Sequence, residues 1–163
     1  MNSNSAMDNI TYHRANQNDI QTLIDYRVIF GLELAGEQTA ESINELREQT
    51  KNYFEKAIND NSYIGYIAKR GNDIAGIGGM VIREQPGTFK NPSGKVGYLM
   101  FMYTVPSFRR NGICTEILSA LMNIGKQMDI AVFELHATKE GEFVYKQNGF
   151  EIRKEPSYRK YIN

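Results

Sequence analysis

The chain has 163 residues, of which 41% are hydrophobic, and its 19 basic and 19 acidic side chains give a formal net charge of zero. This length fits one domain, which can bury roughly 70% of the surface of its unfolded chain without disulfides or metals. The balanced charge argues against nucleic acid as a partner, because nucleic-acid binding usually needs a basic surface.

The N-terminus, MNSNSAMDN, has neither a basic region nor an apolar core, so it is not a signal peptide. We expect residues 1–9 to form a flexible tail and residues 10–163 to form a single domain. No apolar run approaches the ~20 residues that span a membrane, which argues against a membrane partner. The single cysteine, Cys114, excludes an intramolecular disulfide and favours a reducing, cytoplasmic setting.

The first half of the chain predicts one strand, two helices and a hairpin. Asn18 is a candidate N-cap, and apolar residues follow it at helical spacing. Gly31 and Gly36 interrupt the next stretch, and further along the apolar period changes to two. The expected elements are, in order, a strand over 10–14, a helix over 18–30, a loop or broken helix over 31–41, a helix over 43–58, a strand over 62–69, a turn at 71–73, a strand over 74–83 and a loop over 84–95.

The second half alternates strands with helices. Residues 98–105 are apolar on both faces, as expected of a central strand that is covered on both sides, and Pro106 ends this strand. Apolar residues at every fourth position predict an amphipathic helix over 113–128. The chain is therefore expected to form a mixed α/β sheet with helices on its faces. The remaining expected elements are a strand over 131–137, a helix over 139–147, and strands over 150–153 and 157–162.

The strand over 74–83 contains three glycines, Gly76, Gly78 and Gly79. Glycine weakens a strand interior, so these residues indicate a bulge or a close approach of another backbone. They do not form the dinucleotide-binding pattern GxGxxG, because Val81 occupies the place of the third glycine. The chain also lacks GxxxxGK[ST], HExxH and paired CxxC patterns, so no metal site is expected.

The turn RRNGIC, residues 109–114, lies between the strand over 98–105 and the amphipathic helix. The first backbone N–H groups of a helix have no partners within the helix, and the helix dipole adds partial positive charge there. A strand that leads into such a turn predicts a phosphate or pyrophosphate site. Two arginines strengthen this prediction, and Gly112 lets a phosphate approach the backbone.

The pattern Arg109-x-x-Gly112-x-Cys114 resembles the acyl-CoA-binding loop of GNAT-type N-acetyltransferases. The segment LHATKEGEFVYKQNGFE, residues 135–151, resembles the next part of that family, in which a helix tyrosine precedes a Gly-Phe pair. The resemblance covers residues 98–152, and the first half is compatible with it. It implies a single-domain α/β fold, with a mostly antiparallel mixed sheet of about six to seven strands and about four helices.

The resemblance also implies acetyl-CoA as a co-substrate, an amine acceptor and a direct transfer between the two. The backbone amides of residues 109–115 would hold the pyrophosphate, and the main chain before the turn would bind the pantetheine arm. Tyr145 would assist departure of the CoA thiolate and is the candidate catalytic residue. Cofactor binding is implied for Met102, Tyr103, Thr104, Val105, Arg109, Arg110, Asn111, Gly112, Ile113, Cys114, Thr115 and Thr138.

Several points stay open at this level. Tyr145 also fits plain core packing, and Cys114 stands where the family prefers glycine or alanine. The base that deprotonates the amine is either a carboxylate or a water that Tyr103 orients, whereas His13 and His136 read as ordinary polar residues. The candidate carboxylates are Glu33, Glu37, Glu84 and Glu134.

Two alternatives to acetyl transfer stay open. One is a non-catalytic CoA-binding sensor on the same fold, and the other is an unrelated module that binds another phosphate ligand. The acceptor is a small-molecule or peptide amine whose identity the residues do not specify. Homodimerisation through an edge strand also stays open.

Overall fold

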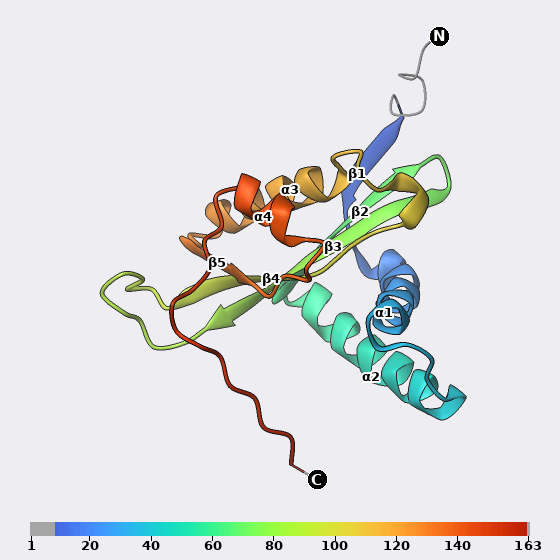
Figure 1. Cartoon of the computed structure of the whole chain (residues 1–163), viewed down its shortest axis with the longest axis horizontal. Coiled ribbons are helices and arrows are strands. Elements are labelled where there is room, and N and C mark those ends of the chain that lie inside the picture. Colours follow the sequence, from blue (N-terminus) through green and yellow to red (C-terminus); the bar gives the residue numbers. More distant parts are fainter. Residues whose placement is uncertain (1–8, 163) are drawn as a thin grey trace.

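The structure is a computed structural model that describes residues 9–162, so the expected tail at 1–9 lies outside the described residues except for Asn9. As far as α4, the elements follow the predicted order (Figure 1). They are β1 (Ile10–Arg14), a short 3-10 helix (Gln17–Asp19), α1 (Ile20–Ala35), α2 (Ala40–Asn59), β2 (Tyr63–Arg70), β3 (Asp73–Glu84), β4 (Lys95–Thr104), a second 3-10 helix (Pro106–Phe108), α3 (Ile113–Gln127), β5 (Val132–Leu135) and α4 (Glu142–Gln147).

The five strands form one sheet in the order β1-β2-β3-β4-β5, so strands that follow one another in the chain also pair. The first four strands are antiparallel, whereas β4 and β5 run parallel because α3 crosses between them. The parallel ladder is short and ends at the pair of Leu99 and Leu135. Residues 100–104 of β4 therefore have no strand partner on the β5 side, and this edge of β4 is open.

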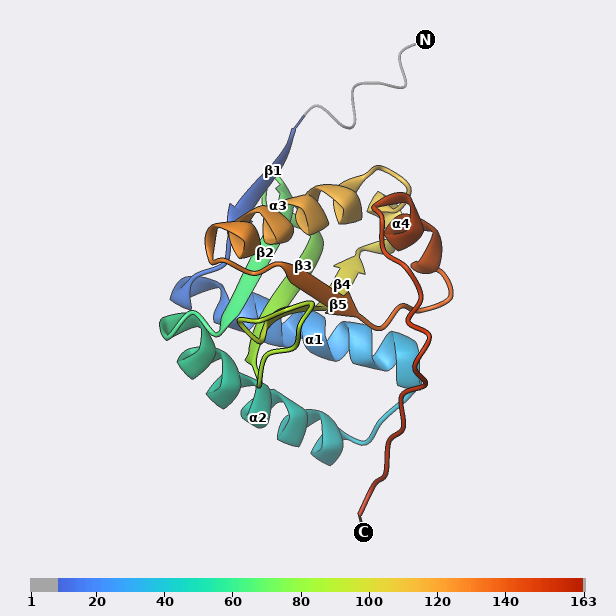
Figure 2. The same cartoon turned by 90° about the vertical axis from the view of Figure 1, so that its left-hand side faces the viewer.

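Helices cover both faces of the sheet. The pair α1 and α2 lies on one face, and α3 and α4 lie on the other (Figures 1 and 2). One hydrophobic core, which includes Leu23 and Phe54, lies beneath α1 and α2, and a second core lies beneath α3. The apolar stripe that the sequence predicts for α3 is confirmed, because Ile117 and Leu121 are at most 1% exposed. Burial of each such side chain contributes about 1.5–3 kcal/mol.

Glycines in β3 let α3 lie close to the sheet. A Cβ atom on Gly76 would lie 2.8 Å from Ile113 Cγ2, and one on Gly78 would lie 2.5 Å from Ile117 Cγ2. The expected close approach is confirmed, although the approaching atoms belong to helix side chains rather than to a backbone. A register shift between β2 and β3, next to Gly76, also confirms the expected bulge.

The first helix is longer than the sequence predicts, because α1 continues through Gly31 and leaves only a short connection of the loop expected over 31–41. A glycine inside a helix costs about 1 kcal/mol relative to alanine. The aromatic ring of Phe30 offsets this cost by stacking on Phe101 of β4, with 6.1 Å between the ring centroids. Gly36, with φ +78°, ends the helix instead.

The two strands expected over 150–153 and 157–162 do not form, so among residues 9–162 the sheet has five strands rather than six or seven. The segment runs away from the sheet as an extended chain (Figure 1). Tyr158 and Ile162 are each 89% exposed. An alternating pattern becomes a strand only when a partner's main chain and an apolar surface are in reach, and the described contact with β5 is a side-chain ion pair from Arg153.

Candidate functional site

The turn between β4 and α3 presents the first backbone N–H groups of α3. The buried ring of Phe108 anchors this turn, and the guanidinium of Arg70 lies 4.6 Å from the centroid of that ring. Two residues with left-handed backbone, Arg110 (φ +63°) and Gly112 (φ +76°), then lead the chain into the helix. No described side chain caps α3, and the space that a Cβ atom on Gly112 would enter is open. This place fits an anion, as the sequence predicts.

Arg109 connects the turn to the end of α1. Its Nη2 donates to both carboxylate oxygens of Glu33, at 2.7 and 2.9 Å, and its Nε donates to the carbonyl oxygen of Thr104 at 2.9 Å. The Arg109 guanidinium also lies over the ring of Tyr103. The pKa of Tyr103 is raised, mainly by burial and secondly by the Glu33 carboxylate. Because Arg109 already pairs with Glu33, a phosphate at the turn would compete with Glu33 for this arginine. Arg110, in contrast, makes no ion pair with the described residues.

β4 contains a bulge in the stretch that has no partner on the β5 side. The register shifts between Ile77 and Gly79 of β3, so one residue of β3 lies opposite two residues of β4, Phe101 and Met102. Phe101 has φ +61°, a left-handed conformation that costs about 1–3 kcal/mol for a residue other than glycine. The bulge directs Phe101 into the core beneath α1 and α2, and Met102 against the core beneath α3. The sequence does not predict this bulge in β4, and its one signal there is the group of glycines in the neighbouring strand.

Tyr145 lies on α4, close to Cys114 in the first turn of α3. Its ring packs edge-on against Phe150, with 6.0 Å between centroids, and the residue is 9% exposed. A Cβ atom on Gly141 would lie 3.0 Å from Tyr145 Cε2 and 3.4 Å from Thr138 Oγ1, so these residues meet at one place. Burial and, second, the nearby Cys114 raise the pKa of Tyr145, and burial raises the pKa of the Cys114 thiol. Both groups are therefore protonated near neutral pH.

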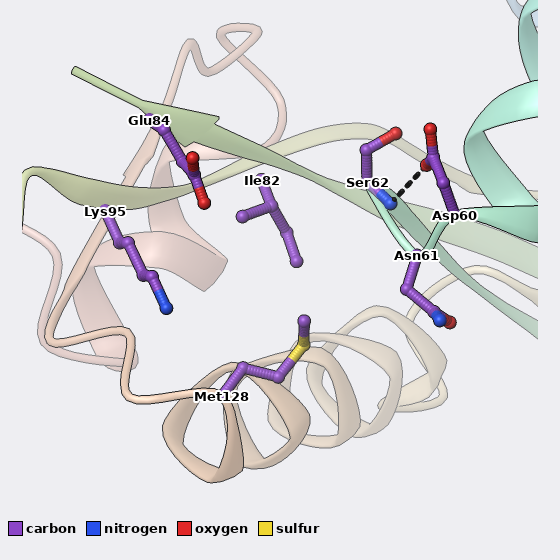
Figure 3. A pocket seen from close by; sticks show the side chains of 7 residues that line it. All are labelled: Asp60, Asn61, Ser62, Ile82, Glu84, Lys95 and Met128. Carbon is purple, nitrogen blue, oxygen red and sulfur yellow. Dashed lines mark hydrogen bonds between the residues drawn. The ribbon is translucent and has the colours of Figure 1, made fainter.

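A cavity of about 600 Å³ lies beside Tyr145, between the end of β5, α4 and the C-terminal segment. We call it the Tyr145 cavity, and its size is typical of small-molecule sites, which measure about 300–1,000 Å³. A second hollow of about 510 Å³ lies at the opposite end of β4 (Figure 3). There Glu84 and Lys95 line one side, Asp60 lines the other, and Ile82 and Met128 lie between them. Glu84 is therefore separated from Tyr145.

The structure brings most of the predicted residues to one end of the sheet. Residues 102–105 finish β4 and lead into the turn at 109–115, and Tyr145 and Thr138 lie next to the start of α3. Of the carboxylates considered as bases, Glu134 lines the Tyr145 cavity but pairs with Arg153 at 3.2 Å. Glu33 is held by Arg109, and Glu37 is exposed between α1 and α2.

Among the described residues, 9–162, no group of three His, Cys, Asp or Glu side chains is arranged to hold a metal ion. No helix within these residues is long and apolar enough to cross a membrane. Neither result changes the location of the site described above.

Known structures share this fold. A predicted acetyltransferase from Clostridium acetobutylicum, solved with acetyl-CoA, is 30% identical and has a TM-score of 0.83 over 93% of this chain and 96% of that chain. A GCN5-related N-acetyltransferase from Ralstonia eutropha JMP134 is 22% identical, with a TM-score of 0.81 over 93% and 98% of the two chains. Glucosamine-6-phosphate N-acetyltransferase from Arabidopsis thaliana is 18% identical, with a TM-score of 0.66 over 96% and 100%. The fold is thus that of an acetyltransferase.

The model of the acetyltransferase (GNAT) family matches residues 31–150, which include β4, the turn at 109–115 and Tyr145. A comparison with curated protein sequences gives no significant match. The chain belongs to the GNAT acetyltransferase family, and this confirms the resemblance drawn from the sequence.

Proposed function

We propose that this protein transfers the acetyl group of acetyl-CoA to a primary amine of a small molecule or peptide, with both substrates bound at once. The observation that carries the proposal is the uncapped start of α3, which lies next to Tyr145 at the open end of β4. Membership of the GNAT family supports acyl transfer, and a 30% identical chain has been solved with acetyl-CoA. Acetyl-CoA supplies the acetyl group as a thioester.

In this proposal the turn at 109–115 holds the pyrophosphate through its backbone N–H groups. The left-handed backbone of Gly112 and the open space around it fit a phosphate close to the main chain. Arg110 adds positive charge, and Arg109 contributes when it leaves Glu33. The main chain of residues 102–105, which has no strand partner on the β5 side, binds the pantetheine arm, with Thr138 on the opposite side.

The proposed role of Tyr145 is to donate a hydrogen bond to the CoA sulfur as the thiolate departs. An ordinary tyrosine has a pKa near 10 and a thiol one near 8.5, so complete proton transfer from phenol to thiolate is uphill by roughly 2 kcal/mol. Burial raises the pKa of Tyr145 further, which makes complete transfer still less favourable. A hydrogen bond that strengthens as negative charge develops is the role that fits this pKa.

The test of this function uses two assays, thermal unfolding with acetyl-CoA and release of free thiol across a panel of amines. We expect acetyl-CoA to raise the melting temperature and Gly112→Glu to abolish the rise, because a carboxylate then occupies the anion site. Gly71→Glu is the matched control, since Gly71 also has left-handed backbone (φ +60°) and open space around its Cβ position. No rise at millimolar acetyl-CoA would refute the cofactor assignment, and a rise without thiol release from any amine would favour a CoA sensor.

A further inference from the structure

We propose that His136 is the base that takes the proton from the acceptor amine, and that Tyr98 is a positioning residue for it. The inference rests on the proposed function and deepens it, because the sequence left this base unassigned. His136 directly follows β5, at the point where the ladder between β4 and β5 ends. It lines the Tyr145 cavity, so the proposed base and the proposed hydrogen-bond donor to sulfur share one space.

The imidazole of His136 is held from the neighbouring strand. Its Nδ1 lies 2.6 Å from the hydroxyl oxygen of Tyr98 on β4. The Tyr98 ring is fixed in turn by Arg83 of β3, whose guanidinium lies 3.6 Å from the ring centroid. When the ring hydrogen is on Nδ1, that N–H donates to the Tyr98 oxygen and Nε2 presents its lone pair to the acceptor. The hydrogen bond to Tyr98 thus fixes the orientation of an imidazole that is exposed to the cavity.

Three arguments favour His136 over the other candidate bases. Imidazole is the side chain that takes up and releases protons near neutral pH. Glu134, the carboxylate nearest in the chain, already pairs with Arg153. The other histidine, His13, lies on β1 and contacts Asp19 at 3.3 Å, so it belongs to the fold rather than to the cavity.

The charges around His136 are mixed and largely paired. The charged groups on the cavity wall are Arg83 of β3, Glu134 of β5, Glu142 and Lys146 of α4, and three residues of the C-terminal segment, Glu151, Arg153 and Glu155. Lys146 pairs with Glu142, and Arg153 pairs with Glu134 and Glu155. The wall thus carries four carboxylates and three cations, which favours a cationic ammonium group.

Every proton and bond in the proposed acetyl transfer is accounted for. An ammonium acceptor loses two protons when it becomes an amide. His136 Nε2 takes the first and releases it to water, and the freed nitrogen lone pair forms the new C–N bond. The C–S bond breaks with its electron pair on sulfur. The second proton leaves the same nitrogen and ends on the CoA sulfur, with Tyr145 hydrogen-bonded to that sulfur.

The first experiment compares wild type with His136→Gln, using n-butylamine as a minimal primary amine and thiol release as the readout. We expect His136→Gln to keep the acetyl-CoA thermal shift and to lower kcat/KM about 10²-fold at pH 7. The loss should shrink towards pH 10, where much of a primary amine is already uncharged. Tyr98→Phe should give a smaller loss and a displaced pH midpoint, and His13→Gln should match wild type. A rate of His136→Gln equal to wild type at pH 7, or a loss that is uniform with pH, overturns the proposal.

A second readout does not depend on turnover. In nitrogen-15 spectra of the wild-type protein saturated with coenzyme A, which carries no acetyl group to transfer, n-butylammonium should shift the ring resonances of His136 and leave those of His13 in place. Unchanged His136 resonances at saturating n-butylammonium overturn the inference. A missing acetyl-CoA thermal shift would instead refute the proposed function, so the two failures are distinguishable.

Discussion

Replacing Tyr145 with phenylalanine tests the proposed hydrogen bond to sulfur directly. Phenylalanine keeps the ring that packs against Phe150 and loses only the hydroxyl group. A hydrogen bond to a charged group contributes about 1.5–3 kcal/mol, which corresponds to a fall in kcat of about 10- to 150-fold. The turn at 109–115 is unchanged, so we expect acetyl-CoA affinity to change less than about threefold. The free energy of unfolding should change by less than about 0.5 kcal/mol.

The assay is thiol release at saturating acetyl-CoA, together with thermal unfolding of each variant. Tyr63→Phe is the matched control, because Tyr63 is 3% exposed and its hydroxyl has no hydrogen-bond partner among the described residues. Its removal should leave kcat unchanged and raise stability by about 1 kcal/mol, or about 2–4 °C in melting temperature. An unchanged kcat in Tyr145→Phe would refute the role of this hydroxyl and leave Tyr145 as a core residue.

Two further predictions follow from the pKa shifts and the ion pair. Folding raises the pKa of Tyr63 and of Tyr145. Their full contribution to the free energy of unfolding is therefore present below pH 10 and is lost as pH rises towards the folded-state pKa values. The loss is up to about 1.4 kcal/mol per pH unit for each tyrosine. Denaturant unfolding at pH 9, 10 and 11 checks this, and Tyr63→Phe should show a shallower fall. Glu33→Gln releases Arg109 and removes a negative charge, so calorimetry should find acetyl-CoA bound about two- to tenfold more tightly at low salt. Weaker binding would indicate that the ion pair itself forms part of the site.

The sequence predicts the elements whose information is local. The stripe on α3 and the turn at 109–114 are each contained in a few consecutive residues, so periodicity and motif suffice for them. The continuation of α1 through Gly31 and the lack of strands after Phe150 depend instead on packing partners, which intrinsic propensity does not include.

The same distinction applies to the site. The turn at 109–115 is local, and the sequence predicts it as an anion site. The contact between Arg109 and Glu33 joins residues 76 positions apart, and that between Tyr98 and His136 joins residues 38 apart. The bulge at Phe101 arises from the pairing of two strands, because one residue of β3 lies opposite two residues of β4. These features depend on the fold, and the roles proposed for Arg109 and His136 depend on them.

The open end of the sheet holds several features that a fold selected only for stability would lack. Phe101 has a left-handed backbone, at about 1–3 kcal/mol, and α3 lacks a side-chain cap worth about 0.5–2 kcal/mol. Both costs are substantial beside the about 5–15 kcal/mol of a typical domain. The missing cap is understandable if a bound ligand supplies the hydrogen-bond acceptors for the first N–H groups of α3. Any ligand that binds only the folded state stabilises it by about 2.7 kcal/mol at a hundred times its Kd, so saturating acetyl-CoA should raise the melting temperature by roughly 5–10 °C, and a shift below about 1 °C at millimolar acetyl-CoA would show that acetyl-CoA is not this ligand.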